Sequence, residues 1–137
     1  MNRRQLLLRG LVVAALAPAA GIAGAKDEAN QTLAVVQDPA YRRSREFASL
    51  LVARGARLFT PEDDMLGLWH GPLAAFSRAA GPMRLAGLTT WSDFLVLRDC
   101  ARQAGMAPLS TLDPDAGGAR PRATLHAWVM GTPPGRY

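Results

Sequence analysis

Cysteine is almost absent from the chain: Cys100 is the single one among 137 residues. One cysteine excludes an internal disulfide framework and a zinc site built from several cysteines. The glycine-rich patterns GxGxxG and GxxxxGK[ST], which bind phosphates, do not occur, and neither does the GxSxG turn of serine hydrolases. We therefore expect no nucleotide site of these types and no hydrolase with that nucleophile.

Charge and long apolar runs are also sparse. The chain has 49% hydrophobic and 20% charged residues, a balance that argues against general disorder and suits one folded domain. The longest apolar stretch runs only from Leu11 to Ile22. A helix that spans a membrane needs about 20 apolar residues, so this stretch is too short.

Residues 1–25 have the layout of a secretory signal. A basic start precedes the apolar stretch, and the small residues Ala23-Gly24-Ala25 follow it at the expected cleavage position. Arg3-Arg4 is followed, after one residue, by two leucines. This segment resembles the twin-arginine (Tat) signals of bacteria, which implies passage of a folded protein through the Tat translocase and cleavage after Ala25. A Sec signal and an uncleaved anchor are the alternatives.

The basic excess of the chain lies mostly in that segment. The whole chain has a formal net charge of +5, but three arginines (Arg3, Arg4 and Arg9) fall within residues 1–25. Thirteen basic and eleven acidic residues remain after cleavage, a net charge of +2. Binding to nucleic acid therefore loses its electrostatic support, and a cleaved chain would have no stable membrane anchor.

Strand-like and helix-like segments alternate after the signal. Short apolar runs predict strands at 33–36, 56–59 and 83–88, and a last one at 123–130. Helical spacing predicts helices at 40–54, at 60–80 with a break at Gly71-Pro72, and from Thr90 to about Ala104. We expect Thr60 and Thr90 to cap the second and third helices, and Leu66 and Ala104 to belong to their buried faces.

This alternation predicts a small α/β fold: a three-layer sandwich with a mostly parallel sheet of about four strands and three helices. We assign residues 26–32 to a flexible leader, 33–130 to one domain and 131–137 to a frayed tail. Residues 106–123, rich in Pro, Gly and Asp, are interpreted as a long loop.

Ligands of open parallel sheets bind in a crevice beyond the carboxyl ends of the strands. That rule selects five residues for a small polar ligand: Asp38, Thr60, Thr89, Thr90 and Trp91. The alternative is that Asp38, Thr60 and Thr90 only cap helices.

A second candidate surface is the basic group Arg42, Arg43 and Arg45 at the start of the first helix. Positive charge is unfavourable at a helix N-terminus, which suggests a binding patch for a partner. A solvated face, with Arg42 paired to Glu46 one helical turn on, is the alternative.

The sequence gives little support for a reactive cysteine or a metal site. Cys100 falls inside a helix, where a buried thiol is inert. The two histidines lie far apart in the chain and make no metal pattern, and joining His70 and His126 with Asp63 and Asp64 is the only grouping to consider. We predict no metal, no identifiable cofactor and no assigned catalytic residue. We expect an exported binding or accessory protein that serves a larger periplasmic protein or a small ligand, with a small enzyme or cofactor carrier as the alternative.

Overall fold

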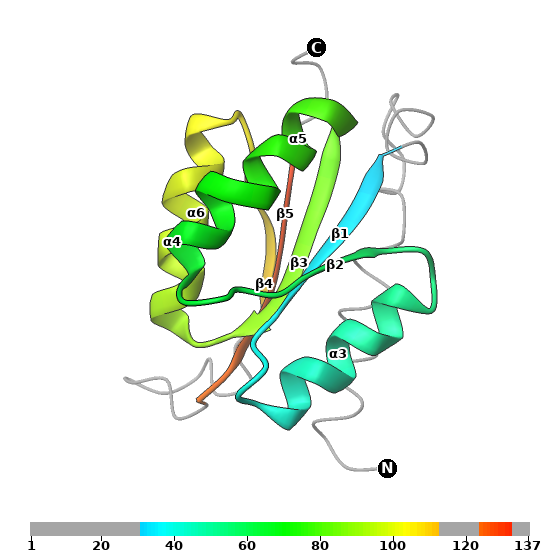
Figure 1. Cartoon of the computed structure of the whole chain (residues 1–137), viewed down its shortest axis with the longest axis vertical. Helices are drawn as coiled ribbons and strands as arrows, with labels where there is room; N and C mark the ends of the chain where they lie inside the picture. Colours follow the sequence, from blue (N-terminus) through cyan, green and yellow to red (C-terminus); the bar gives the residue numbers. More distant parts are fainter. Residues whose placement is uncertain (1–30, 113–123, 133–137) are drawn as a thin grey trace.

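A five-stranded sheet in the order β2-β1-β3-β5-β4 forms the centre of the fold (Figure 1). The computed structural model describes residues 31–112 and 124–132. Within them the strands are β1 (Thr32–Gln37), β2 (Arg57–Phe59), β3 (Met83–Thr89), β4 (Ala107–Leu112) and β5 (His126–Gly131). Strands β1, β2 and β3 run parallel, with β1 between the other two. The α/β class predicted from the sequence is confirmed.

The prediction of a mostly parallel sheet with about four strands is wrong. Strand β5 runs antiparallel to both β3 and β4, so two of the four strand pairs are antiparallel. The extra strand, β4, comes from residues that we interpreted as loop. It carries Pro108 and a register irregularity between Pro108 and Ser110, which an edge strand tolerates because one of its sides needs no partner. Strand β4 therefore has no clear apolar run in the sequence.

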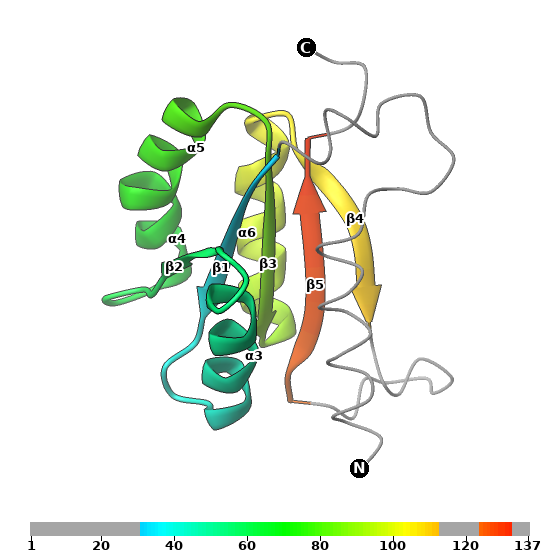
Figure 2. The ribbon, with the colours of Figure 1, turned by 90° about the vertical axis from the view of Figure 1, so that its right-hand side faces the viewer.

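Helices cover both faces of the sheet (Figure 2). Helix α3 (Arg42–Val52) packs on one face. The other face carries α6 (Trp91–Gln103) and a kinked helical segment made of α4 (Met65–Leu68), η1 (Trp69–Leu73) and α5 (Ala74–Ala80). Three layers result, because each chain return between parallel strands crosses one face of the sheet.

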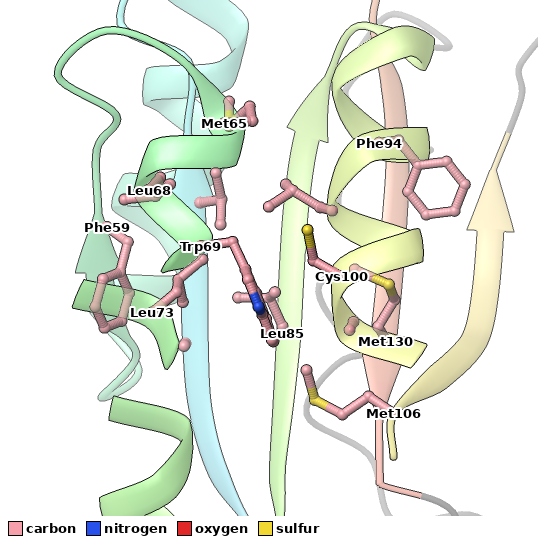
Figure 3. Packing of buried hydrophobic residues seen from close by; sticks show 14 of the residues in the cluster. Phe59, Met65, Leu68, Trp69, Leu73, Leu85, Phe94, Cys100, Met106 and Met130 are labelled. Carbon is pink, nitrogen blue, oxygen red and sulfur yellow. The ribbon is translucent and has the colours of Figure 1, made fainter. Parts of the chain in front are cut away.

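The middle strands alternate their side chains between two buried clusters. Ala34, Val36 and Leu85 point to the cluster under α4, η1 and α6, whereas Val35 and Ala86 point to the cluster under α3. Figure 3 shows Met65, Leu68, Trp69 and Leu73 on one side of the larger cluster, and Leu85, Phe94, Cys100, Met106 and Met130 on the other. Both faces are therefore apolar, which leaves the strand ends for polar function.

Most helix ends follow the local signals in the sequence. Gly55 and Gly105 have positive φ just beyond α3 and α6, the conformation that ends a helix at low cost for glycine. The hydroxyl of Thr90 accepts a hydrogen bond from the Asp93 N–H, as expected of the residue that caps α6. The break at Gly71-Pro72 is confirmed, because η1 contains Pro72 and a non-helical Gly71.

The start predicted for the second helical segment is too early. The segment begins at Met65, and its cap is Asp64, whose carboxylate accepts a hydrogen bond of 2.7 Å from the Gly67 N–H. The later start changes which side chains face the sheet: Met65 and Leu68 are buried, and Leu66 is 49% exposed. Ala104, at the end of the third helix, is exposed as well.

Several predicted regions lie wholly or partly outside the described residues. These are the signal at 1–25, residues 26–30 of the leader, residues 113–123 of the predicted loop and residues 133–137 of the tail. Thr32, which we assigned to the leader, begins β1, and Gly131, which we assigned to the tail, ends β5. Among the described residues, no helix is long and apolar enough to cross a membrane.

Candidate functional site

The connections of the parallel strands reverse direction at β1. The chain leaves β1 over one face of the sheet to reach β2, then returns over the other face to place β3 on the opposite side of β1. Such a reversal separates the loops that follow neighbouring strands, and ligands of α/β proteins bind at that edge. We call the ends of β1, β2 and β3, together with the starts of α4 and α6 and residue His126, the carboxyl edge.

Asp38 and Thr60 lie at this edge, and each has a local structural partner. The Asp38 carboxylate accepts a hydrogen bond of 3.1 Å from the Ala40 N–H, while its own N–H donates to Ser44 Oγ at 2.8 Å. Thr60 Oγ1 accepts a hydrogen bond of 3.2 Å from the Gln37 side-chain amide. Asp38 therefore shapes the turn before α3, and Thr60 ties the end of β2 to that of β1 without capping a helix.

Thr89 and Thr90 have different roles. Thr89 is fully buried, and its hydroxyl donates to the Thr90 carbonyl at 3.0 Å and accepts the indole N–H of Trp128 at 2.9 Å. Thr90 caps α6 through the Asp93 N–H at 3.3 Å. Thr89 is therefore part of the framework beneath the edge, and Thr90 is the one that faces its surface.

A chain of aromatic rings connects this edge to the core. Trp91 lies 5.0 Å from Phe94, and Phe94 lies 5.5 Å from Trp128, between ring centroids. Trp128 is fully buried and lies over Gly87, where a Cβ atom would come within 2.4 Å of its ring. Trp91 at the other end is 40% exposed. The stack thus presents one indole to solvent on a rigid base.

His126, which the sequence analysis considered only as part of a metal grouping, lies at the carboxyl edge. It pairs in register with Thr89, is 3% exposed, and its ring centroid lies 5.1 Å from that of Trp91. Its Nδ1 is buried and has no hydrogen-bond partner among the described residues, 31–112 and 124–132. In the sequence, the only sign that His126 is buried is its position at the start of an apolar strand. Its neighbours Thr89 and Trp91 come from a strand and a helix much earlier in the chain, so the sequence did not reveal them.

Asp93 brings negative charge to the same edge. Burial raises the pKa of the Asp93 carboxyl above its usual value, a hydrogen bond with Thr90 lowers it, and the nearby charges of Asp38 and Asp64 raise it further. These three carboxyl groups come from the turn after β1, the cap of α4 and the first turn of α6. The fold therefore gathers acidic groups that are far apart in the sequence.

The arginines of the second candidate surface have local partners. Arg42 forms the predicted ion pair with Glu46, with 3.0 Å between Nε and Oε1, and both side chains are largely exposed. Arg45 donates to the Pro39 carbonyl. Arg43 is exposed on the same turn of α3. These contacts are typical of a solvated helix face, and a role in binding a partner stays a prediction.

The other predicted reactive groups do not meet at the carboxyl edge. Cys100 is buried inside α6, and burial, followed by the charge of Asp99, raises the pKa of its thiol. His70 is exposed on η1, whereas His126 is buried on β5. Within residues 31–112 and 124–132, no three His, Cys, Asp or Glu side chains are grouped closely enough to hold a metal ion.

The fold alone does not indicate a function, because a mixed α/β sheet of this kind supports many unrelated activities. The geometry singles out the carboxyl edge, where Trp91 contacts His126 and Asp93 lies on the same first turn of α6 as Trp91. Comparisons with known proteins assign no family: no protein-family model, curated protein or solved structure matches this chain.

Proposed function

We propose that this chain is an exported binding protein that takes a small polar ligand at the carboxyl edge. The observation that carries the proposal is the exposed Trp91 ring beside polar groups at the reversal of strand order. An indole held over a buried aromatic stack offers a large contact area with little loss of conformational entropy. Polar groups around it supply orientation.

The hydrogen bonds at this edge favour binding over catalysis. Asp38, Thr60 and Thr90 are each held in one geometry by a backbone or side-chain partner. Groups fixed in this way orient a ligand at low entropic cost. The thiol of Cys100 is buried in the core, and its raised pKa makes it a poor nucleophile.

Export is part of the proposal and rests on residues 1–25. The Arg3-Arg4 pair supports the Tat route, and a change of both residues to lysine should abolish Tat-dependent export. Tat-dependent export of that variant would show that the arginine pair is not the signal, and export of the wild type without the Tat translocase would refute the Tat assignment. Export through Sec would keep the binding proposal and replace the route.

Native mass spectrometry of protein recovered from the exported fraction of its own cells tests the binding proposal. We expect a bound small molecule that Trp91→Ala releases and Leu109→Ala retains. Leu109 is a matched control because it is 46% exposed but lies beside Gly131, at the end of β5 opposite His126. Equal occupancy in both variants would contradict a site at Trp91.

Two other results would replace the proposal with one of its alternatives. A co-purifying protein that is lost when Arg42, Arg43 and Arg45 are changed to serine would indicate an accessory role. A bound cofactor identified by mass and absorption would indicate a carrier or a small enzyme. Each result has a different readout, so the three functions are separable in one preparation.

A further inference from the structure

We propose that the ligand at the carboxyl edge carries a small organic ammonium group, which donates an N–H to His126 Nδ1 and packs against Trp91 beside Asp93. This inference rests on the proposed function and gives it a chemical class. Its basis is a buried nitrogen that has no partner in the part of the chain that the structure describes, an exposed aromatic ring in contact with that histidine, and a local excess of carboxyl groups.

His126 is the unusual feature of this edge. A buried nitrogen without a partner costs about 1–3 kcal/mol, so proteins rarely keep one where an apolar residue would fit. The rest of β5 from Ala127 to Met130 is apolar and buried, and a leucine at 126 would suit that pattern. The presence of a histidine instead is explained if the ligand provides the missing hydrogen bond.

The neighbouring ring shows how a ligand would reach that nitrogen. Trp91 is the first residue of α6 and lies edge-on to His126, with 5.1 Å between centroids at an interplanar angle of 62°. Because Trp91 is 40% exposed, it borders solvent on one side and the buried His126 on the other. In this proposal the ligand reaches Nδ1 when the exposed Trp91 side chain turns away from His126.

The charges around this position select the sign of the ligand. Asp93 follows Trp91 on the first turn of α6, and the charges of Asp38 and Asp64 are close enough to act on it. Helix α3, which carries Arg42, Arg43 and Arg45 in its first turn, packs on the opposite face of the sheet from α6 (Figure 2). Carboxylates on the α6 side repel an anion and attract a cation.

An ammonium group satisfies all three features at once. It has N–H donors and no acceptor, which complements an unprotonated ring nitrogen and a carboxylate. Its charge is also attracted to the face of an indole. A neutral alcohol would satisfy only the histidine, and a quaternary ammonium, which lacks N–H groups, would satisfy only the indole and the carboxylates.

Nitrogen-15 NMR of the full chain tests this class with four probes: n-butylammonium, tetramethylammonium, butyrate and 1-butanol. The titrations are run at about pH 8, where alkylamines are charged and imidazoles in general are neutral. We expect n-butylammonium to shift the His126 ring nitrogens and the Trp91 indole together. We expect it to bind at least about fivefold more tightly than tetramethylammonium or 1-butanol, and butyrate to leave both signals unchanged.

Two variants of α6 test whether the charge of Asp93 contributes to binding, apart from any effect on folding. Asp93→Asn should weaken n-butylammonium binding by about fivefold, and Asp99→Asn should leave it unchanged. Asp99 is the matched control because it lies on α6, is 65% exposed and pairs with Arg98. Trp91→Ala should weaken binding by about tenfold. All three positions are at least partly exposed, so their variants should fold.

The outcomes of these titrations test the ammonium class separately from the proposed binding function. Equal binding of tetramethylammonium and n-butylammonium refutes the hydrogen bond to His126. Binding of butyrate or 1-butanol at Trp91 without n-butylammonium refutes the ammonium class and keeps a polar-ligand site. If no probe shifts His126 or Trp91, the ammonium class is refuted, and the ligand retained in native mass spectrometry decides separately whether the edge binds anything.

Discussion

Replacement of Gly87 by alanine tests the packing that supports the candidate site. A Cβ at this position would lie 2.4, 2.8 and 2.9 Å from three ring atoms of Trp128. Carbon atoms in contact prefer about 3.5–4.0 Å, so the indole must move by about 1 Å. Trp128 is fully buried, and its N–H donates to Thr89 at 2.9 Å, which leaves it little room to move.

The free-energy cost follows from three effects. Overpacking of a close-packed core costs about 1–3 kcal/mol. A weakened indole hydrogen bond adds about 0.5–1.5 kcal/mol. Reduced freedom of the unfolded chain returns about 0.4–1 kcal/mol. We expect Gly87→Ala to lower the free energy of unfolding by about 2–3 kcal/mol, or the melting temperature by about 10–20 °C for a domain of this size.

Urea denaturation of four proteins provides the assay: the wild type, Gly87→Ala, Trp128→Phe and the double variant. The smaller Phe ring gives the new Cβ more room, so Gly87→Ala should cost less than half as much in the Trp128→Phe background. The double-mutant cycle then isolates the clash from the effect of alanine itself. A Gly87→Ala variant within about 0.5 kcal/mol of the wild type would refute the packing described for Trp128, as would equal costs in both backgrounds.

Three further predictions concern the groups around the carboxyl edge and the buried thiol. His126→Leu should raise the free energy of unfolding in urea by about 1 kcal/mol, because it removes a buried nitrogen that no described residue pairs with, and a loss above about 1 kcal/mol would mean that Nδ1 has a partner. The folded chain binds the Asp93 proton more tightly than the unfolded chain, because burial raises this pKa above 3.8. Asp93 therefore costs stability as the pH rises through and above 3.8. Asp93→Asn should gain stability over the wild type as urea titrations move from about pH 3 to about pH 7, and a pH-independent difference would contradict this. Cys100, buried and with a raised thiol pKa, should react with a thiol-specific disulfide reagent at least about tenfold more slowly in the folded chain than in urea, and rapid labelling of the folded chain would show that the thiol is accessible.

Local patterns were enough to predict the elements that lie inside the sheet or cap themselves. Strand β1 contains a continuous apolar run, and β3 is apolar from Leu85 to Leu88, because both faces of these strands are buried. Thr90 marks the start of helix α6, and Gly105 marks its end. The start predicted for the second helical segment is too early, because Thr60-Pro61 offers the same capping signal that Asp64 actually provides.

Strand β4 and the antiparallel direction of β5 could not be predicted in the same way. An edge strand with Pro108 has a weak apolar pattern, and pairing between β4 and β5 joins residues that are separated by the segment 113–123. Direction depends on how the chain returns to the sheet. A return without a crossover helix places the next strand antiparallel, and the sequence does not state where that strand inserts.

The α/β class, the Thr90 cap and the glycine stops could be read from the sequence, because these features depend on neighbours a few positions apart. The five residues first proposed for the site stay a prediction. The folded chain was needed to find that His126 lies in register with Thr89 and against Trp91. It was also needed to find that the charges of Asp38 and Asp64 act on Asp93. Those relations depend on strand order and register, which arise when segments far apart in the chain pack into one core.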